Sequence, residues 1–581
     1  MKSGLIIIFT MFFGLQLLGC TSDDAGSSKD DSDSNIIDSE SSTDSDSTKS
    51  GSDSVVDSDS FADSDSVDDS DSVADSDTGK NIFSKNRVEK SFTDPSNSDV
   101  VITPVTFDAT VSVDAGDSVN RVLSTVFGNN GVAWRKNTLN NTTLQRHVKN
   151  MNMPVMRLPG GNWSNQWLWD GDGTHWALKD NYLDDIQGLP TKTWPMTTDE
   201  MFLLSGQLGA VPQVCVNYSL ARYIDEADPV LKAAQYAADW VADLKVKGIN
   251  AEYFEVGNEN YGSWQAGYEV GGVQITAKEY GEDFVKFADA MKSANPDIKV
   301  GAVIYPEEDG SNVANWTQDV VNAVQDSADY LIAHEYFTWA TDLNSITFAQ
   351  ILGAKTKIAE DMENIKKMVE ENSDKTIDEL PVAMTEFNMR AGEKNTMGVA
   401  ALFISEALGE FIKAGYGLVN IWDIENGAGF EDHGMFANGE TGADDETPHP
   451  SFFAYYFYNM MFGDTMVSSS SDDNTVFSYA STFKNGYVGI VTVNEEDKGK
   501  NIKLDVSNFN RGTVLYRYEV SFDSLDSRNI YVNGQTAPSG KIYGPDNYED
   551  IPPYEQDITT GDVIIPVKKY SVNFTVIKPS N

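Results

Sequence analysis

Cysteine and histidine are scarce in this chain. The 581 residues include two cysteines, Cys20 and Cys215, and five scattered histidines. No Cys/His cluster has the spacing of a zinc site, so we expect no metal centre and no other cofactor. Cys215 lies in the apolar run 211–217, and we expect it to be a buried, inert thiol without a disulfide partner.

Positive charge is scarce as well. Lys and Arg number 42 against 90 Asp and Glu, which gives a formal net charge of −48. Such an excess of negative charge opposes binding to nucleic acid and to anionic lipid. We therefore expect no nucleic-acid partner, and contact with a membrane only through a covalent anchor.

The first 20 residues have the pattern of a secretion signal. Lys2 precedes the apolar run 5–18, which is too short to span a bilayer. The run ends in Leu17-Leu18-Gly19-Cys20, which resembles the lipobox of bacterial lipoproteins and implies that Cys20 is lipidated. An ordinary signal peptide is the alternative. Because Thr21 is not the aspartate that retains many lipoproteins at the inner membrane, we expect an outer-membrane, cell-surface or extracellular location in a bacterial envelope.

Residues 21–85 form a linker dominated by serine and aspartate. Between residues 21 and 80 there are 19 acidic residues and three lysines, and apolar residues are few. Such a segment cannot bury enough surface to fold, and its own charge keeps it extended. We interpret it as a tether; calcium binding is an alternative with no loop geometry to support it.

From about residue 122, strand-like and helix-like patterns alternate. This alternation predicts a parallel sheet built from βα units, with long helices such as 230–246 and 348–371 between the strands. Eight strands are enough to close a (β/α)8 barrel, an α/β fold that we assign to residues 122–450. The predicted strands are 126–130, 153–158, 212–216, 251–256, 298–304, 330–333, 381–388 and 418–422.

The pattern changes in residues 451–581. Short alternating runs such as 487–493 and 513–520 are separated by Asn, Gly, Asp and Pro, which is typical of a β-sandwich. Residues 100–121 are also β-patterned, and we expect them to add a strand to this C-terminal domain. A structural brace is favoured over carbohydrate binding, because no aromatic platform stands out.

Two glutamates end predicted strands, Glu259 after the fourth strand and Glu386 in the seventh. A barrel of this kind carries its chemistry at the carboxyl ends of its strands. Cleavage of a glycosidic bond requires two carboxyl groups, one protonated and one ionised. We therefore predict a catalytic pair acting on a polysaccharide or oligosaccharide, in which the pKa of Glu386 is held low and that of Glu259 is held high.

Further residues at strand ends are candidate substrate contacts. Asn258 precedes Glu259 and is placed to hydrogen-bond a sugar hydroxyl. Tyr336 is placed to donate a hydrogen bond to the nucleophile, and His334 is placed to line the floor of the site between the two glutamates. Each of these has ordinary loop packing as its alternative. The remaining candidates for stacking on or hydrogen bonding to a sugar are Asn129, Asn162, Trp163, Asn217 and Trp422.

Three stretches, 157–162, 208–217 and 255–262, resemble the retaining clan A glycosidases, and most closely the family 51 α-L-arabinofuranosidases. The resemblance covers about residues 100–581. It implies that Glu259 is the acid/base and Glu386 the nucleophile, with double displacement at the anomeric carbon. It also implies substrate contacts, which fall on Asn162, Asn258 and Tyr336.

The sequence departs from that family at two places. Asn129 and Asn130 stand where the family has a glutamate on strand one, and Thr385-Glu386-Phe387-Asn388 replaces Asp-Glu-Trp-Asn. These changes leave the predicted reaction, glycoside hydrolysis, intact but not the arabinofuranoside specificity. The alternative is an endo-acting glycanase that cuts β-glucan, xylan or an agarose-type galactan. Two alternatives from other classes are a non-catalytic polysaccharide-binding lipoprotein of the cell surface and a structural or adhesive lipoprotein.

Overall fold

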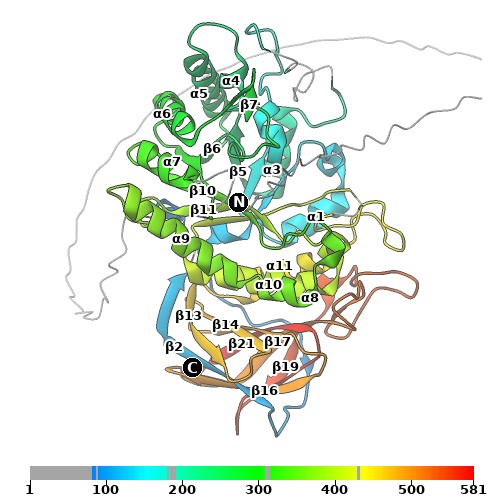
Figure 1. The fold of residues 1–581 in the computed structure, drawn as a ribbon. Helices are drawn as coiled ribbons and strands as arrows, with labels where there is room; N and C mark the ends of the chain where they lie inside the picture. The colour runs from blue at the N-terminus through cyan, green and yellow to red at the C-terminus, as the bar shows by residue number, and fades with distance from the viewer. Residues whose placement is uncertain are drawn as a thin grey trace, which may run out of the picture. The chain divides into compact units, whose positions relative to one another are not determined.

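A computed structural model describes residues 81–86, 89–179, 182, 192–307, 315–427, 429 and 432–580 (Figure 1). The predicted signal peptide, its Cys20 and the tether up to residue 80 lie outside the described residues. Among the residues described, no helix has the length and apolar character needed to cross a membrane.

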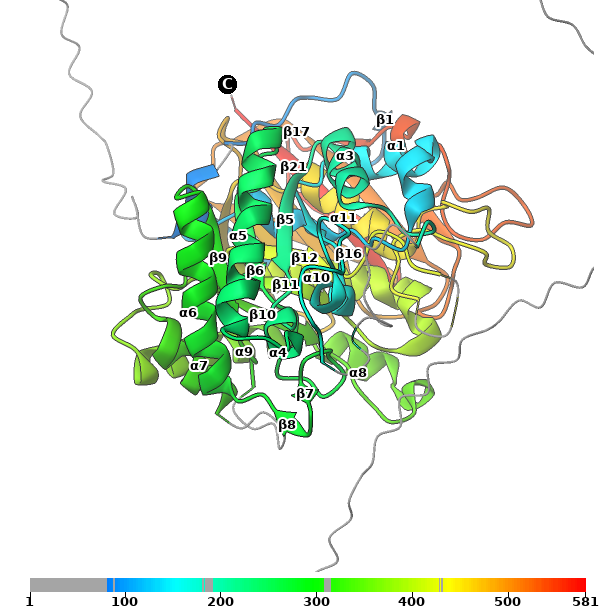
Figure 2. The same cartoon turned by 90° about the horizontal axis from the view of Figure 1, so that it is seen from above.

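Eight parallel strands close into a barrel, which confirms the predicted fold class (Figure 2). Their residues are almost entirely buried, as expected for strands covered by helices on one side and filled by side chains on the other. The last strand closes the barrel on the first through Asn420 opposite Gly128. The strands are β3 (Gly128–Asn130), β4 (Val155–Leu158), β5 (Val211–Val216), β6 (Tyr253–Val256), β9 (Lys299–Val303), β10 (Tyr330–Tyr336), β11 (Val382–Asn388) and β12 (Leu418–Ile421).

Helices surround the barrel, and their ends carry the expected signals. Thr197 and Glu200 form a capping box at the start of α3, and glycines in the left-handed region end α3 (Gly209, φ 77°) and α5 (Gly248, φ 69°). The helices are α1 (Thr142–Asn150), α3 (Thr198–Leu208), α4 (Leu220–Tyr223), α5 (Pro229–Lys247), α6 (Ala277–Ala294), α7 (Trp316–Val324), α8 (Phe348–Gly353), α9 (Thr356–Asn372), α10 (Gly398–Ala414) and α11 (Pro450–Met461).

Three boundaries differ from the sequence prediction. The linker expected over 21–85 ends earlier, because Ile82–Asn86 form a short 3-10 helix and Phe83 is buried against Tyr253 and Tyr330 of the barrel. The single helix expected over 348–371 is broken into α8 and α9, where the buried Lys355 reaches Glu406 (3.0 Å) and Glu495 (2.5 Å). The predicted sandwich, starting at 451, begins instead with the helix α11. Its aromatic side chains are buried against the barrel and the sandwich together, so the barrel's helical layer extends to Met461.

The C-terminal domain is a single eleven-stranded sheet that curls around its own core, as predicted for a β-sandwich. That second core contains Val111, Ile490, Leu504, Ile565 and Ile577. The strands are β1 (Asp99–Val100), β2 (Ala109–Arg121), β13 (Thr465–Ser471), β14 (Val476–Thr482), β15 (Val488–Asn494), β16 (Lys500–Ser507), β17 (Arg511–Phe522), β18 (Ile530–Val532), β19 (Tyr554–Asp557), β20 (Ile564–Val567) and β21 (Ser571–Pro579). A separate two-stranded hairpin, β7 (Glu269–Val270) and β8 (Val273–Gln274), follows β6.

Strand β2 belongs to this sheet although it precedes the barrel in the chain. It lies between β13, to which it is antiparallel (Ser112 opposite Ser470), and β16, to which it is parallel (Val111 opposite Leu504). The chain therefore starts the sandwich, builds the whole barrel and then returns to complete the sandwich.

Candidate active site

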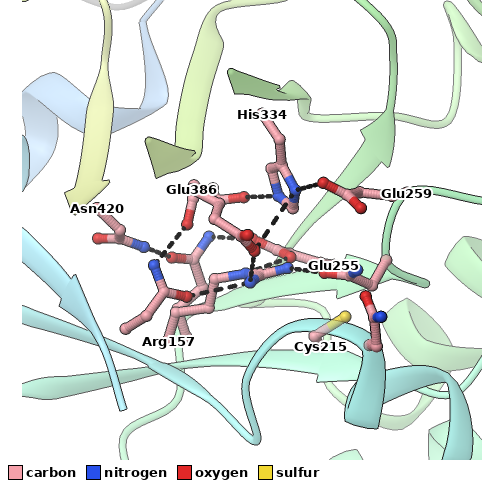
Figure 3. Close-up of polar contacts among 12 residues, drawn as sticks. Arg157, Cys215, Glu255, Glu259, His334, Glu386 and Asn420 are labelled. Atoms are coloured by element: carbon pink, nitrogen blue, oxygen red, sulfur yellow. Dashed lines mark hydrogen bonds and ion pairs between the residues drawn. The ribbon is translucent and has the colours of Figure 1, made fainter. Parts of the chain in front are cut away.

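Glu259 and Glu386 meet at the carboxyl ends of their strands. After β6, Gly257 (φ 82°) and Glu259 (φ 45°) turn the chain, and a Cβ at Gly257 would strike the side chain of Asn260. Glu386 lies on β11, and one carboxylate oxygen of each glutamate and a ring nitrogen of His334 all lie within 4.8 Å of one another (Figure 3). The predicted pair is therefore brought together.

His334, from β10, lies between the two carboxylates. Its Nδ1 is 3.1 Å from Glu259 Oε1 and 3.6 Å from Glu386 Oε2, and its Nε2 is 2.9 Å from Thr385 Oγ1. The ring is almost fully buried. These contacts fix the imidazole so that a single nitrogen faces both glutamates.

Glu386 accepts hydrogen bonds on both oxygens. The hydroxyl of Tyr336 donates to Oε1 (2.6 Å), which is the contact expected from the sequence, and Arg157 Nη1 donates to Oε2 (3.3 Å). Burial and the charge of Glu386 raise the pKa of Tyr336 well above its usual value, so the phenol keeps its proton and remains a donor. Both contacts orient the carboxylate and favour its ionised form.

Glu259 is held by a different set of donors. Trp264 Nε1 donates to Oε2 at 2.7 Å, and Gln265 Nε2 donates to the same oxygen at 2.9 Å. Gln265 also donates to Asn162 Oδ1 (2.6 Å), which connects this predicted contact residue to the acid. Trp264 and Gln265 thus position Glu259.

The pKa order in the free site is the reverse of the predicted order. Burial raises the pKa of Glu386, and the charge of Glu259 adds to this effect, so the pKa lies above its usual value despite His334, Arg157 and Tyr336. Burial acts the same way on Glu259, but the hydrogen bond and charge of His334 outweigh it and lower the pKa. His334 lies closer to Glu259 (3.1 Å) than to Glu386 (3.6 Å), and the Trp264 hydrogen bond further lowers the pKa of Glu259.

Arg157 is the buried cation at the centre of the site, and we did not single it out from the sequence. Besides Glu386, its guanidinium donates to Glu255 Oε2 (2.8 Å), Asn130 Oδ1 (3.0 Å) and Asn258 Oδ1 (2.7 Å). Burial disfavours its charge, but Glu255 and Glu386 outweigh that effect and raise its pKa. The sequence did contain a signal for this role: Arg157 is a charged residue inside the buried strand 153–158, and a buried charge requires an oppositely charged or hydrogen-bonding partner.

Glu255 extends this network across the barrel (Figure 3). Its Oε1 accepts from Gln213 Nε2 (2.8 Å), and Gln213 Oε1 accepts from Asn420 Nδ2 (2.6 Å). Side chains from β4, β5, β6 and β12 are therefore joined beneath the glutamates. The network fixes the floor of the site.

The predicted contact residues fall into two groups. Asn258 is buried, and its Nδ2 has no hydrogen-bond partner among the described residues, so it can donate to a ligand. Asn217 is instead tied to protein groups, because its amide donates to Trp167 O and Tyr182 Oη and accepts from Leu220 N.

The predicted aromatic contacts form a cluster at one side of the site. Trp163 packs against Trp134 (ring centroids 5.0 Å apart) and Trp194 (5.2 Å), and Trp134 also contacts Trp422 (6.0 Å). Trp194 is 56% exposed, so the cluster reaches the surface. The predicted contact Asn129 does not reach the surface, because it is fully buried and its Nδ2 donates to Met435 Sδ.

By distance alone, the atoms of Glu259, His334 and Glu386 could also hold a metal ion. Their surroundings favour another chemistry. The N–H and O–H groups of Trp264, Gln265, Tyr336 and Arg157 already point at the two carboxylates. These donors set up two carboxyl groups for proton transfer and nucleophilic attack.

Comparison with known proteins agrees with this geometry. A family model described as glycosyl hydrolases family 39 matches residues 246–497, which include both glutamates. An intracellular exo-alpha-(1->5)-L-arabinofuranosidase from Halalkalibacterium halodurans is 26% identical over 198 residues, 33% of this chain and 38% of that protein. A probable alpha-L-arabinofuranosidase C from Aspergillus fumigatus is 31% identical over 178 residues, 29% of this chain and 32% of that protein. The chain thus spans about a third of the length of these relatives.

Solved structures match over most of the described chain. The alpha-L-arabinofuranosidase of Thermotoga maritima (TM-score 0.59, 17% identity) covers 81% of this chain and 99% of its own. A family 51 enzyme from Bifidobacterium longum (TM-score 0.62, 14% identity) covers 82% and 100%, and a family 44 xyloglucanase from Paenibacillus polymyxa (TM-score 0.56, 15% identity) covers 81% and 99%. These identities establish a shared fold. By sequence and by fold, the chain is therefore similar to the (β/α)8 glycoside hydrolases of clan A, the family 51 arabinofuranosidases among them.

Proposed function

We propose that this chain is a retaining glycoside hydrolase that cleaves a plant or algal polysaccharide, or its oligosaccharides, by double displacement. The observation that carries the proposal is the spacing of the glutamates, with a carboxylate oxygen of each within 4.8 Å of the other. Retaining pairs stand about 5–5.5 Å apart, whereas inverting pairs stand about 6.5–9.5 Å apart to admit a water molecule. This spacing favours direct attack by a carboxylate.

Glu386 is the proposed nucleophile. Its carboxylate attacks the anomeric carbon while the glycosidic C–O bond breaks, and Tyr336 and Arg157 hold it in position. The free amide N–H of Asn258 donates to a hydroxyl of the sugar, and the Arg157 contact to Asn258 Oδ1 fixes the direction of that amide.

Glu259 is the proposed acid/base. It gives its proton to the leaving oxygen, and after the leaving group departs it takes a proton from the water that releases the sugar from Glu386. In the free site its charged form is stabilised by His334 and Trp264. A leaving-group oxygen that bonds to Oε2 competes with Trp264 and Gln265 for that oxygen, which weakens two of the contacts that favour the charged form.

The two roles are tested by substitution and chemical rescue. We expect Glu386→Ala to be nearly inactive on every substrate. Glu259→Ala should still form the glycosyl-enzyme from an activated aryl glycoside, and azide should rescue it to a glycosyl azide of retained configuration. Glu393→Ala, at a largely exposed glutamate after β11, is the control. An inverted first product in proton NMR, or exchanged behaviour of the two variants, would refute the assignment.

The relatives' names favour arabinofuranoside-type substrates, but strand one argues for a longer glycan. Asn129 and Asn130 stand where the family has a glutamate. Exposed tryptophans suited to stacking on sugar rings are Trp194, Trp264 and Trp339 (56%, 50% and 58% exposed). An endo-acting glycanase is therefore the second candidate. A panel of aryl glycosides and plant and algal polysaccharides separates them: we expect better turnover of an oligo- or polysaccharide, and fast, preferred release from aryl arabinofuranoside would contradict this.

We also propose that the enzyme is displayed on the cell envelope by a lipid on Cys20. The lipobox-like Leu17-Leu18-Gly19-Cys20, followed at once by the acidic run, supports this placement. A multiply acylated terminus binds a membrane firmly, whereas one acyl chain gives only marginal binding.

A further inference from the structure

Strand β11 carries one extra residue where it passes the catalytic pair. Ala333 of β10 lies opposite Met384. The next residue, His334, lies opposite Glu386, so Thr385 has no counterpart on β10. The pairing of β11 with β12 shifts over the same stretch. Bulges of this kind re-aim side chains and are frequent next to active sites.

The bulge brings two consecutive side chains to one imidazole ring. Neighbouring residues of a regular strand point to opposite faces of the sheet. Here Thr385 Oγ1 lies 2.9 Å from Nε2 of His334, and Glu386 Oε2 lies 3.6 Å from Nδ1 of the same ring. Thr385 is fully buried, and its hydroxyl has no other hydrogen-bond partner among the described residues. The threonine hydroxyl is therefore dedicated to His334.

The other ring nitrogen faces negative charge. Nδ1 lies 3.1 Å from Glu259 Oε1 and 3.6 Å from Glu386 Oε2 (Figure 3). The charge of Arg157 and the hydroxyl of Tyr336 are directed at Glu386. Because an ionised carboxylate can only accept hydrogen bonds, an ionised glutamate at this position favours a proton on Nδ1.

A hydroxyl is suited to the nitrogen on the far side of the ring, because it can donate or accept, whereas a carboxylate can only accept. When the ring carries two protons, Nε2 donates to Thr385 Oγ1. When the ring carries one, the hydroxyl turns and donates to the bare Nε2, and the remaining proton stays on Nδ1. The hydrogen bond made by one nitrogen of a histidine decides in this way where the other proton lies.

We propose that Thr385 is a positioning residue that keeps an N–H on Nδ1 of His334, directed at the catalytic glutamates, whether the ring is charged or neutral. This inference rests on the proposed function. In that reaction, negative charge moves from Glu386 to Glu259 as the glycosyl-enzyme forms. One N–H between the two carboxylates serves the charge at both positions without a movement of the ring.

The first test observes the ring directly. The full chain is labelled with 15N in its five histidines, and His334→Gln identifies the signals of His334. At alkaline pH, where the ring has lost its second proton, we expect wild-type His334 to keep the remaining proton on Nδ1. Thr385→Ser should show the same tautomer, and Thr385→Asp, which can only accept, should hold a proton on Nε2 to higher pH. A neutral wild-type ring protonated on Nε2 would overturn the proposal.

The second test is kinetic. Thr385→Val removes the hydroxyl and keeps the shape, so we expect kcat/KM to fall about 2- to 10-fold, while Thr385→Ser keeps the wild-type value. Thr385→Asp should lose more activity on glycosides with poor leaving groups than on activated aryl glycosides, because a doubly protonated ring holds Glu259 in its charged form. Thr356→Val, at an exposed threonine of α9, is the control.

The two tests separate the proposal from the reaction on which it rests. Wild-type kinetics in both Thr385→Val and Thr385→Asp, or an equal loss on all leaving groups in Thr385→Asp, would refute the role of Thr385. If the wild type cleaves no glycoside, the proposed function fails, and the tautomer of His334 in the wild type and in Thr385→Ser still decides whether Thr385 sets the position of the proton.

Discussion

The hydroxyl of Tyr336 donates a 2.6 Å hydrogen bond to Oε1 of Glu386, the shorter of the two protein hydrogen bonds that this carboxylate accepts. Tyr336→Phe removes this bond and keeps the ring. A hydrogen bond to a charged group contributes about 1.5–3 kcal/mol, so we expect kcat/KM to fall about 10- to 100-fold. The pKa of Glu386 should rise further, moving the acidic limb of the pH–rate profile upward.

The control for this change is Tyr531→Phe, whose hydroxyl bonds Asp523 in the sandwich. It should leave the profile unchanged. An unshifted acidic limb in Tyr336→Phe would show that the tyrosine does not stabilise the carboxylate charge.

Glu386 is predicted to lower stability at neutral pH. Because its pKa in the folded protein is raised, mainly by burial, folding favours the protonated form. Its favourable contribution is therefore complete below the unfolded-state pKa and is lost as the pH rises through the folded-state pKa. Glu386→Gln should raise Tm at pH 7 and have a smaller effect near pH 4. A Tm difference that is the same at both pH values, measured by calorimetry, would contradict this.

Arg157 should be indispensable for folding as well as for activity. Arg157→Met leaves Glu255 buried without its cation, and breaking a buried pair in this way costs about 3–5 kcal/mol. The double variant Arg157→Met/Glu255→Gln should recover part of that loss, since the stranded charge is removed. Urea unfolding of both single variants and the double variant measures the coupling. Additive losses would show that Glu255 is not the main partner.

The barrel could be predicted because its signals are local. Apolar runs ending in polar residues marked all eight strands, and the ends of strands four and seven identified Glu259 and Glu386. The break between α8 and α9 was missed, and the contacts that bury Lys355 there, to Glu406 and Glu495, join residues distant in sequence. Helix α11 was missed because its apolar residues are nearly continuous, which gives no clear helical period.

The sequence predicted the catalytic pair, but it predicted only some of the residues that support that pair. Tyr336 and His334 could be inferred because they end a neighbouring strand, but the opposite pKa shifts of the two glutamates depend on their burial and on how His334, Trp264 and Arg157 surround them. Arg157 bonds side chains from three other strands, and no single stretch of sequence contains that arrangement.

Lipidation of Cys20 is testable by cell fractionation. We expect the wild-type protein in the membrane fraction, labelled by a fatty-acid probe, and Cys20→Ala to lose the label. Cys215→Ala is the matched control, since that thiol is buried in the barrel. Wild-type protein found free and unlabelled in the medium would rule out the anchor.

The position of β2 between β13 and β16 has a consequence for synthesis on the ribosome. Residues 109–121 emerge early but cannot pair until residues 465–507 have been translated, after the entire barrel. Until then Val111 and Val113, buried in the finished sheet, remain open to solvent. The nascent chain therefore carries an unpaired strand through most of its synthesis, and the acidic run before it, with its charge repulsion, opposes association of that strand with other chains.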